Sequence, residues 1–297
     1  MSELFGGKTD YPFAWDVYTS PVMDDIGEEP DFHKIKRNDT NETLHIATKR
    51  YNPISNKQFM ETVDSLVKHF DCKIEKAGSF KNGKEIFVQM TNNDFVDTLI
   101  PGDKNGQVKG FVTLANSHNG GLAFRLFAGL IRIWCTNTWT VANRYADVAL
   151  SVKHTINARD RVTAFVHNIE NIAKMQHMVI QQIKDRTEMK FRGVEEFAEE
   201  LYRLEYKPRP YTRINKNGIT EKLWTGPELS TRGENLIENF VKVYDKYDDI
   251  EHGNWRLFNA VTDVVDHGAS ENRISNGYTM FGGGNNLKLR AFDLIYG

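Results

Sequence analysis

The segment Asn116-Ser117-His118-Asn119-Gly120-Gly121 contains the end of one largely apolar stretch, residues 110–117, and leads into a second, residues 122–135. An Asn-Gly pair is a strong hairpin signal because both residues tolerate a positive φ. A turn this short can join only antiparallel neighbours. The segment therefore predicts an antiparallel hairpin at the centre of the β-sheet.

The residues before this hairpin predict more of the same sheet. Residues 73–80 and 84–90 flank Lys81-Asn82-Gly83, which is a second Asn-Gly turn. Residues 43–51 alternate apolar and polar side chains, as a half-buried strand does. The sheet is therefore expected to be built from hairpins.

Helices are predicted before and after the central hairpin. In residues 56–70 apolar side chains recur at helical spacing, and Ser55 lies three residues before Gln58, as in a capping box. Later segments predicted as helices are residues 138–150, 157–184, 194–204, 231–247, 254–267 and 287–295. Because strands come first and helices after, the expected fold class is α+β: a central antiparallel β-sheet with hairpins, packed by a helix from the N-terminal half and by a helical C-terminal half.

The expected domain organisation has three parts. Residues 1–43 contain many turn formers and are predicted as an extended N-terminal arm. Residues 44–190 form the predicted α+β core domain, and residues 191–297 a helical region packed on that core. Within the last two parts, residues 206–226 and 277–286 are predicted as loops.

Composition limits the kind of protein. The formal net charge is −2, so any nucleic-acid site has to be a local patch. The cysteines Cys72 and Cys135 form no CxxC pattern, which favours a reducing compartment and argues against a disulfide scaffold or a zinc ribbon. There is no signal-peptide layout and no apolar run of roughly 20 residues that would span a bilayer. We expect a cytoplasmic protein of its host cell that makes no membrane contact.

Two arginines lie in or beside apolar strand segments. Arg125 and Arg132 need carboxylate or phosphate partners, or a solvated face. Asn137 and Thr138 are predicted to lie at a helix start, where backbone N–H groups favour an anion. The alternative is that Asn137 or Thr138 only caps the helix and that the arginines pair with acids.

Catalysis is not predicted. Cys135 could act as a nucleophile with His118 or His154, but a buried inert thiol is the commoner fate of a cysteine in a strand. We therefore assign no catalytic residue.

No metal and no cofactor are predicted either. The histidines form no HExxH motif. Asp263 and His267 share a helix face near Asp266, which could ligate a cation but more simply makes an ion pair and a C-terminal cap.

Residues 206–224 are rich in cations and aromatic rings. The cations are Lys207, Arg209, Arg213, Lys216 and Lys222, and the aromatic residues are Tyr206, Tyr211 and Trp224. Cations interleaved with stacking platforms are what sequence-tolerant binding of a single nucleic-acid strand requires. A solvated connector between helices is the equal alternative. The Gly-rich residues 277–286, beside Lys288 and Arg290, could contact a phosphate backbone or form a plain surface loop.

Several blocks along the chain resemble one family of phage and plasmid proteins, a domain of unknown function (nine-three-two). Asn116-Ser117-His118-Asn119-Gly120 resembles the family's Asn-Ser-His-Asp-Gly turn, with Asn119 where Asp is usual. Three further blocks match: Thr48-Lys49-Arg50-Tyr51 with Asn56, Arg125 with Ile131-Arg132-Ile133-Trp134-Cys135-Thr136-Asn137-Thr138, and Lys153-His154-Thr155. The last block comprises residues 254–263 and Asp266-His267. It includes Asn259, and Asp263 stands where the family has Glu. The blocks run in the family's order over about residues 44–295.

The resemblance implies a protein of mobile genetic elements and brings no established activity. The expected order of elements is also similar to the core of Rad52-like single-strand annealing proteins. From this we expect a non-catalytic protein that binds single-stranded DNA and supports recombination or replication, with a possible homo-oligomer. The expected contacts are Arg125, Arg132, Lys153, Lys207, Arg209, Tyr211, Arg213, Lys216, Trp224, Lys288 and Arg290.

Two other classes of function stay open. One is a host-takeover or anti-defence module that binds a host protein. The other is a hydrolase of nucleic acid or nucleotides that uses a divalent cation at Asp263, Asp266 and His267.

Overall fold

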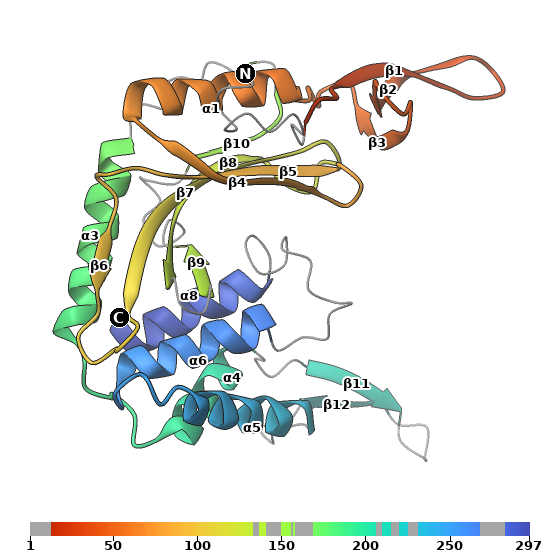
Figure 1. The fold of residues 1–297 in the computed structure, drawn as a ribbon. Helices are drawn as coiled ribbons and strands as arrows, with labels where there is room; N and C mark the ends of the chain where they lie inside the picture. Colours follow the sequence, from red (N-terminus) through yellow and green to blue (C-terminus); the bar gives the residue numbers. More distant parts are fainter. Residues whose placement is uncertain are drawn as a thin grey trace. The chain divides into compact units, whose positions relative to one another are not determined.

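The structure is a computed structural model that describes residues 13–132, 137–140, 150–155, 157, 169–205, 210–214, 220–224, 231–267 and 283–297. Its first elements are β1 (Val17–Met23), β2 (Glu28–Arg37), β3 (Thr43–Thr48), α1 (Asn56–Phe70), β4 (Lys73–Phe80), β5 (Glu85–Thr91), β6 (Asp97–Leu99), β7 (Gln107–Ser117), β8 (Phe124–Arg132), β9 (Asn137–Thr140) and β10 (Leu150–Val152). The later elements are α3 (Ile169–Asp185), α4 (Val194–Glu205), β11 (Pro210–Ile214), β12 (Thr220–Trp224), α5 (Thr231–Lys246), α6 (Asn254–His267) and α8 (Gly283–Tyr296) (Figure 1). The predicted α+β class is confirmed.

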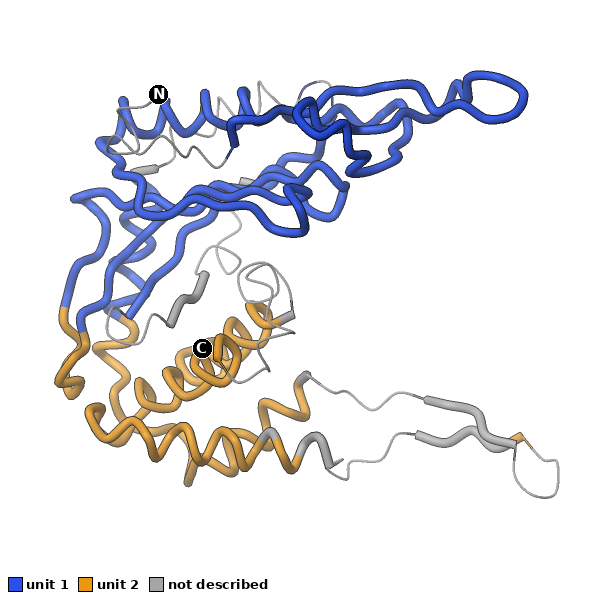
Figure 2. Tube along the Cα trace, turned by 45° about the vertical axis from the view of Figure 1, so that its right-hand side comes forward, with its two compact units in different colours: residues 1–98, 107–181, 275–277 blue, residues 99–106, 182–274, 278–297 orange. Residues whose placement is uncertain are grey.

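The chain divides into two compact units (Figure 2). Unit 1 comprises residues 1–98, 107–181 and 275–277, and unit 2 comprises residues 99–106, 182–274 and 278–297. The three-part division predicted from the sequence, into an arm, a core and a helical region, stays a prediction.

Unit 1 contains the predicted central sheet. Its strand order is β10-β8-β7-β5-β4, with β6 paired to β7 and β9 paired to β8. The β7–β8 hairpin is antiparallel, with Leu114 opposite Leu126, and Gly120 in its turn has φ +69°. In the β4–β5 turn Lys81, Asn82 and Gly83 all have positive φ. Both Asn-Gly hairpins predicted from the sequence are therefore confirmed.

Helix α1 covers one face of this sheet (Figure 1). It begins after the predicted capping box, in which Ser55 Oγ accepts from the N–H of Gln58 and the Gln58 side chain accepts from the N–H of Ser55. Its apolar stripe is buried, and the Phe59 ring meets the edge of Phe124 from β8 at 6.0 Å between centroids. The amphipathic pattern and the capping box thus located this helix correctly.

Helix α3 also packs on the central sheet, through a buried amide. Gln176 Nε2 donates to the backbone oxygens of Phe111 at 2.9 Å and Gly129 at 3.1 Å, which lie opposite each other on β7 and β8. A Cβ on Gly129 would lie 2.1 Å from the Phe111 ring, and a Cβ on Gly110 would lie 2.2 Å from Gln176 Oε1. Glycine is therefore required at both positions for the ring and the helix to approach the strands. The first part of the predicted helix 157–184, residues 158–168, lies outside the described residues.

The predicted helix over residues 138–150 is wrong at both ends. Residues 137–140 form strand β9 and pair with β8, with Thr138 opposite Ile131 and Asn137 opposite Arg132. Residue 150 begins strand β10, and residues 141–149 lie outside the described part. Threonine and tryptophan favour strands, and pairing with β8 outweighs a weak helical spacing. Asn137 and Thr138 do not begin a helix, so the anion site expected at a helix start is also wrong.

Two other segments are more regular than the sequence predicts. Residues 17–37, expected as part of an extended arm, form β1 and β2, which join β3 in a separate three-stranded sheet. Within the predicted loop 206–226, β11 and β12 form an antiparallel ribbon with Thr212 opposite Lys222. The sequence between these two strands contains Asn217-Gly218, the same hairpin signal that located the other two turns.

Unit 2 is mainly helical, with α4, α5, α6 and α8 as its described helices. Its core includes Phe258, Phe292 and Tyr296, whose rings meet at centroid distances between 4.8 and 6.4 Å. Helices α5, α6 and α8 occur close to where they are predicted. None of the helices among the described residues has the length and apolar character needed to cross a membrane.

Candidate nucleic-acid interface

The three-stranded sheet β1-β2-β3 has one face turned toward the rest of unit 1. Along β2, His33 and Ile35 are buried, and Ala47 of β3, opposite His33, is buried as well. Because side chains alternate between the faces of a strand, these positions form one face of the sheet. This face supplies the apolar contacts that hold the sheet against unit 1.

The opposite face, here named the outer face, carries cations and exposed apolar side chains. Strand register places on it Tyr18, Ser20, Phe32, Lys34, Lys36, Ile46 and Thr48. Tyr18 and Phe32 are each 40% exposed, and Ile46 is 51% exposed. Lys34 and Lys36 make no ion pair with any described residue, and none of the seven side chains is a carboxylate. The outer face is therefore a cationic surface with aromatic rings.

A cation–π contact anchors the sheet beside the β4–β5 turn. The Arg37 guanidinium lies 4.1 Å from the centre of the Trp15 ring and donates to Asn82 O at 3.2 Å. It also makes a bidentate pair with Asp39, at 2.9 and 2.6 Å. This hydrogen-bonded pairing raises the pKa of Arg37 and lowers the pKa of Asp39. Gly83 is needed here, because its φ is +86° and a Cβ would lie 2.8 Å from both Arg37 and Trp15.

The family-like turn of the β7–β8 hairpin belongs to a buried polar cluster next to this anchor. Asn56, the first residue of α1, donates from Nδ2 to Trp15 O at 2.8 Å, so its Oδ1 accepts from His118 Nε2–H at 2.8 Å. Asn116 donates to Ile54 O at 2.9 Å, and Ser117 Oγ donates to Leu122 O at 2.6 Å. These side chains tie the hairpin turn to the N-terminus of α1 and to the segment that precedes β1.

Both histidines of the cluster are neutral. Burial, with a smaller contribution from His154 and Arg37, lowers the pKa of His118 to about 3. Burial also lowers the pKa of His154, which donates from Nε2 to Leu122 O at 3.2 Å and accepts the Ile54 N–H at Nδ1. His154 donates at one ring nitrogen and accepts at the other, which only a neutral ring can do, and His118 has no partner for a proton on Nδ1 among the described residues. His118 and His154 therefore act as buried structural polar groups.

Tyr51 links the end of β3 to the same cluster. Its ring stacks on His154 at 4.8 Å between centroids, and its hydroxyl donates to Ser117 O at 3.0 Å. Burial raises the pKa of Tyr51 to about 12. Gly120 faces His45 of β3, 3.2 Å from where its Cβ would be. The resembling blocks around residues 48–56, 116–120 and 153–155 thus meet in space, and their geometry is that of a joint between the two sheets of unit 1.

The two arginines of the central sheet, Arg125 and Arg132, differ in how far they are buried. Arg132 is fully buried, so the predicted phosphate contact at this residue is wrong. Arg125 is half-buried, lies opposite Ala115 and Ser151, and its Nε has no hydrogen-bond partner among the described residues. Lys153 is exposed. Arg125 and Lys153 stay predicted contacts.

The basic stretch 206–224 can be placed only in part. Tyr211 and Arg213 lie in β11 and Trp224 in β12, with Trp224 opposite Pro210. Lys207, Arg209 and Lys216 lie outside the described residues, as does Cys135. These residues stay predicted contacts, and Cys135 stays unassigned.

In unit 2, the predicted phosphate contact at Lys288 is wrong. It is predicted to contact phosphate from a Gly-rich loop, but it lies in α8, is 1% exposed, and forms an ion pair with Asp266 at the end of α6. Burial lowers the pKa of Lys288, while the Asp266 carboxylate acts in the opposite direction. Residues 283–286 of the predicted loop belong to α8, and residues 277–282 lie outside the described part. Arg290 is exposed and donates to Leu204 O at 3.4 Å.

The acidic residues of α6 have structural partners. Asp263 accepts from the Tyr247 hydroxyl at 2.7 Å and lies 3.9 Å from Lys246 Nζ. Asn259 is buried and donates to Trp255 O, and His267 is exposed at the helix end. The described residues contain no group of three or more His, Cys, Asp or Glu side chains able to hold a metal ion.

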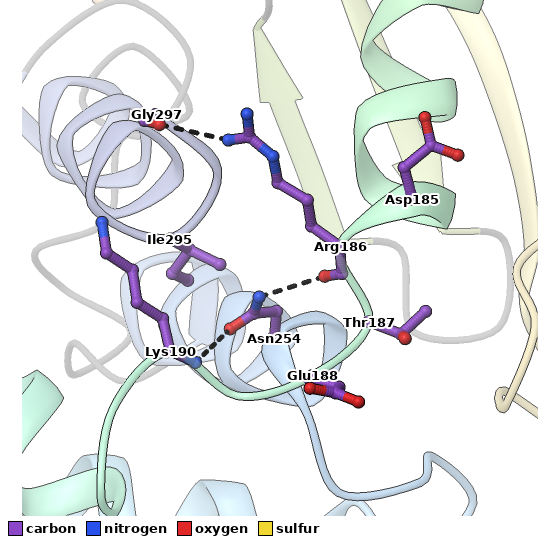
Figure 3. A pocket seen from close by; sticks show the side chains of 8 residues that line it. All are labelled: Asp185, Arg186, Thr187, Glu188, Lys190, Asn254, Ile295 and Gly297. Atoms are coloured by element: carbon purple, nitrogen blue, oxygen red, sulfur yellow. Dashed lines mark hydrogen bonds between the residues drawn. The ribbon is translucent and has the colours of Figure 1, made fainter.

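Unit 2 also has a pocket of about 480 Å³ beside the start of α6 (Figure 3). Asn254 forms its floor, donating to Arg186 O at 3.0 Å and accepting from Lys190 N–H at 3.2 Å. The Arg186 guanidinium donates to Tyr296 O and Gly297 O, and Lys190 Nζ donates to Leu294 O at 3.0 Å. These cations cap the C-terminal end of α8, as cations near helix ends do. The pocket is therefore part of the helix packing.

The outer face of β1-β2-β3 was not identified from the sequence. The alternation Phe32-His33-Lys34-Ile35-Lys36 is a strand signal that was available. Placing Tyr18 and Ile46 beside these residues, however, requires the register between three strands.

Comparison with known proteins identifies a family for this chain. Residues 43–286 match a family model described as "Domain of unknown function (DUF932)". No curated protein and no solved structure matches the chain.

Proposed function

The chain belongs to the DUF932 family, which is defined by a domain of unknown function, and from its own geometry we propose an activity. The protein binds single-stranded DNA across the outer face of β1-β2-β3. The observation that carries this proposal is the juxtaposition of Lys34 and Lys36 with the exposed rings of Tyr18 and Phe32, where none of the seven side chains that the register places together is a carboxylate.

The chemistry of this face fits a single strand. Lysines attract the phosphate backbone, and aromatic faces stack on bases of any sequence. Bases inside a duplex are already stacked on each other, so exposed rings favour a strand whose bases are free. Lys34 lies between Ser20 and Ile46 in the register, and Lys36 lies opposite Tyr18, so each cation has its neighbours at cross-strand distance.

The rigidity of the support also favours binding. The opposite face of the same sheet is held by the Arg37–Trp15 contact and by buried Ile35. A site whose side chains stand on strands loses less conformational entropy on binding than a site on a loop. Arg125 and Lys153, which belong to the same unit, would extend the contact area, whereas buried Arg132 and Lys288 are not part of the proposal. The cations of residues 206–224 stay a separate predicted contact.

The test is a binding titration of the full chain with a labelled oligothymidylate, followed by fluorescence anisotropy at about 50 and about 200 mM salt. We expect affinity that falls steeply with salt and that exceeds the affinity for a duplex of the same length. Absence of binding at the lower salt concentration, or binding that salt leaves unchanged, would contradict the proposal.

A further inference from the structure

The three-stranded sheet β1-β2-β3 carries opposite charges at its two ends. At one end, here named the basic end, Lys36 lies opposite Tyr18 and Lys34 lies opposite Ser20. At the other end, here named the acidic end, residues 24–31 contain five acidic residues and no basic residue: Asp24, Asp25, Glu28, Glu29 and Asp31. Figures 1 and 2 both show the β1–β2 turn of the acidic end projecting past β3. The sheet is therefore polarised along its strands.

The two ends are too far apart to neutralise each other within one chain. From Ser20, opposite Lys34, to Asp24 the strand advances by roughly 13 Å at about 3.3 Å per residue. The Debye length in physiological salt is about 8 Å, so the attraction between the ends is largely screened. Among the described residues the ion pair at the acidic end is Glu28 with Lys49, at 3.4 Å between exposed side chains, which neutralises little. Both ends therefore present their charge to an external partner.

Exposed apolar side chains are concentrated on the same sheet. Among the described residues eight large apolar side chains are exposed, and five of them belong to this sheet and its turn: Tyr18, Met23, Ile26, Phe32 and Ile46. Single exposed apolar residues are normal on a protein surface, whereas a concentration of them marks an interaction site. Phe32 follows the acidic residues and precedes Lys34 in β2, so it lies between the two charged ends.

The acidic end holds its apolar side chains in a defined conformation. Asp24 Oδ1 accepts from the backbone N–H groups of Ile26 at 2.8 Å and Gly27 at 2.9 Å, and the Asp24 N–H donates to Gly27 O at 2.9 Å. These bonds close the turn and leave Ile26 98% exposed and Met23 61% exposed. Such side chains gain free energy only when they are covered, and the ordered turn has already lost the conformational entropy that binding would cost.

One partner complements both charged ends and the apolar side chains between them, namely a second copy of the same sheet. We propose that two chains pair through their outer faces as a two-fold dimer, with the strands of the two sheets antiparallel and the axis crossing them near Phe32. Each contact of a two-fold interface occurs twice. The acidic end of each chain then lies on the basic end of the other, and Phe32 of one chain lies near Phe32 of its partner. A partner of uniform charge would be repelled at one end.

The size of the outer face sets the strength of this dimer. Strand β1 has seven residues and the sheet has three strands. At about 3.3 Å per residue and about 4.8 Å between strands, the face measures roughly 23 by 14 Å. This footprint of roughly 300 Å² is smaller than the about 800 Å² per partner of a stable complex. We therefore expect a weak, reversible dimer that forms at micromolar concentrations and above.

The dimer would regulate the face that is proposed to bind DNA. Pairing covers Lys34, Lys36, Tyr18 and Phe32, so a second copy and a single DNA strand compete for the same side chains. This competition rests on the proposed function, whereas the dimer itself does not require DNA binding. The outer face is thus free in dilute protein and covered in concentrated protein until DNA displaces the second copy.

The first experiment measures the mass of the nuclease-treated full chain by sedimentation equilibrium from about 1 to about 500 μM, at about 50 and about 200 mM salt. We expect the mass to rise from that of one chain to a limit of two chains, with a several-fold weaker dimer at the higher salt concentration. A monomer at every concentration in the lower salt would overturn the proposal. A mass that rises past two chains would refute two-fold pairing.

A charge exchange then identifies the two ends. Lys34→Glu with Lys36→Glu, and separately Asp25→Lys with Asp31→Lys, should each stay monomeric, because like charges then meet at both contacts. Their equimolar mixture should form dimers again, since both contacts once more join opposite charges. Dimers of either variant alone, or a mixture that stays monomeric although both variants are folded, would refute the pairing. If the Glu variant does not fold, Lys34→Gln with Lys36→Gln should also weaken the dimer.

Two control variants make the same charge changes at exposed sites elsewhere. Lys73→Glu with Lys76→Glu, on β4, matches the lysine pair, and Asp94→Lys with Glu188→Lys matches the acidic pair. Both controls should dimerise like the natural chain. Loss of the dimer in either control would mean that net charge, and not the polarised sheet, drives association.

Ile26→Ala separates the dimer from DNA binding, because Ile26 lies in the turn and not on the outer face. It should weaken the dimer by about tenfold, while thermal unfolding stays unchanged because Ile26 is 98% exposed. The affinity for oligothymidylate, measured at nanomolar protein, should also stay unchanged. Unchanged dimerisation in Ile26→Ala would show that the turn is not part of the contact.

The last experiment adds a short oligothymidylate, of about eight nucleotides, to the dimer. We expect the mass to return to that of one chain with one bound strand. A dimer that persists with oligothymidylate bound to it would overturn the shared face. If the oligothymidylate does not bind at all, the proposed function fails, and the mass and charge-exchange measurements on the protein alone still decide whether the dimer exists.

Discussion

The Nε2–H of His118 donates to Oδ1 of Asn56 over 2.8 Å, and this buried hydrogen bond joins the β7–β8 turn to the first residue of α1. The donor and acceptor are 62 positions apart in the chain. The neutral imidazole is favoured, because a proton on the other ring nitrogen, Nδ1, would be buried without a hydrogen-bond partner among the described residues. The stability of unit 1 is thereby coupled to the protonation of one histidine.

The first prediction concerns pH. In the unfolded chain a histidine has a pKa near 6.5, whereas burial lowers the pKa of His118 in the folded chain to about 3. Between these values the unfolded state binds the additional proton, so stability is lost as pH falls below about 6.5. We expect the free energy of unfolding to decrease by up to about 1.4 kcal/mol per pH unit from this residue, measured by urea denaturation at about pH 7 and about pH 5.

His118→Gln is the matched variant for this prediction, since a Gln amide keeps a donor and does not titrate. The slope of stability against pH should become shallower by about one proton, while His154, whose pKa is also lowered, keeps contributing. An unchanged slope would mean that His118 is not the group that titrates.

The second prediction tests the lysines of the outer face. Lys34→Glu with Lys36→Glu should weaken binding of oligothymidylate and reduce the magnitude of the slope of log affinity against log salt by about 1.4, at about 0.7 per lost phosphate contact. Lys73→Glu with Lys76→Glu, on exposed positions of β4, makes the same charge change and should alter the slope much less. Equal effects of the two pairs would mean that net charge, and not the outer face, controls binding.

The third prediction tests the aromatic rings. Tyr18→Ala and Phe32→Ala should each cost roughly 1–3 kcal/mol of binding free energy if a base stacks on each ring. Tyr18→Phe keeps the ring and should bind nearly as the natural chain does. If Tyr18→Ala and Tyr18→Phe weaken binding equally, the lost group is the hydroxyl, and stacking on this ring is excluded.

The fourth prediction concerns the packing of the central sheet. Gly129→Ala places a methyl group 2.1 Å from the Phe111 ring, which has to move out of its contact with β8. Overpacking of this kind costs about 1–3 kcal/mol, so the midpoint of urea unfolding should decrease. An unchanged midpoint would mean that the Phe111 ring accommodates the methyl group without loss of packing.

The sequence by itself determined the local elements whose causes are local. The Asn119-Gly120 and Asn82-Gly83 turns, the capping box of Ser55 and Gln58, and the apolar stripe of α1 all depend on residues a few positions apart. Residues 137–140, 210–214 and 220–224 were mispredicted because a strand is stabilised by a partner that the local pattern does not contain.

The candidate sites were decided by the tertiary structure. Nothing near Lys288 in the sequence indicates that Asp266 neutralises it, and nothing near Phe32 indicates that Tyr18 and Ile46 lie on its face of the sheet. The blocks that resemble the family were legible in the sequence, but only their meeting around His118 showed that they join two sheets. The physical reason is that burial and strand register arise between distant segments, and these two properties decide whether a cation is available to a ligand.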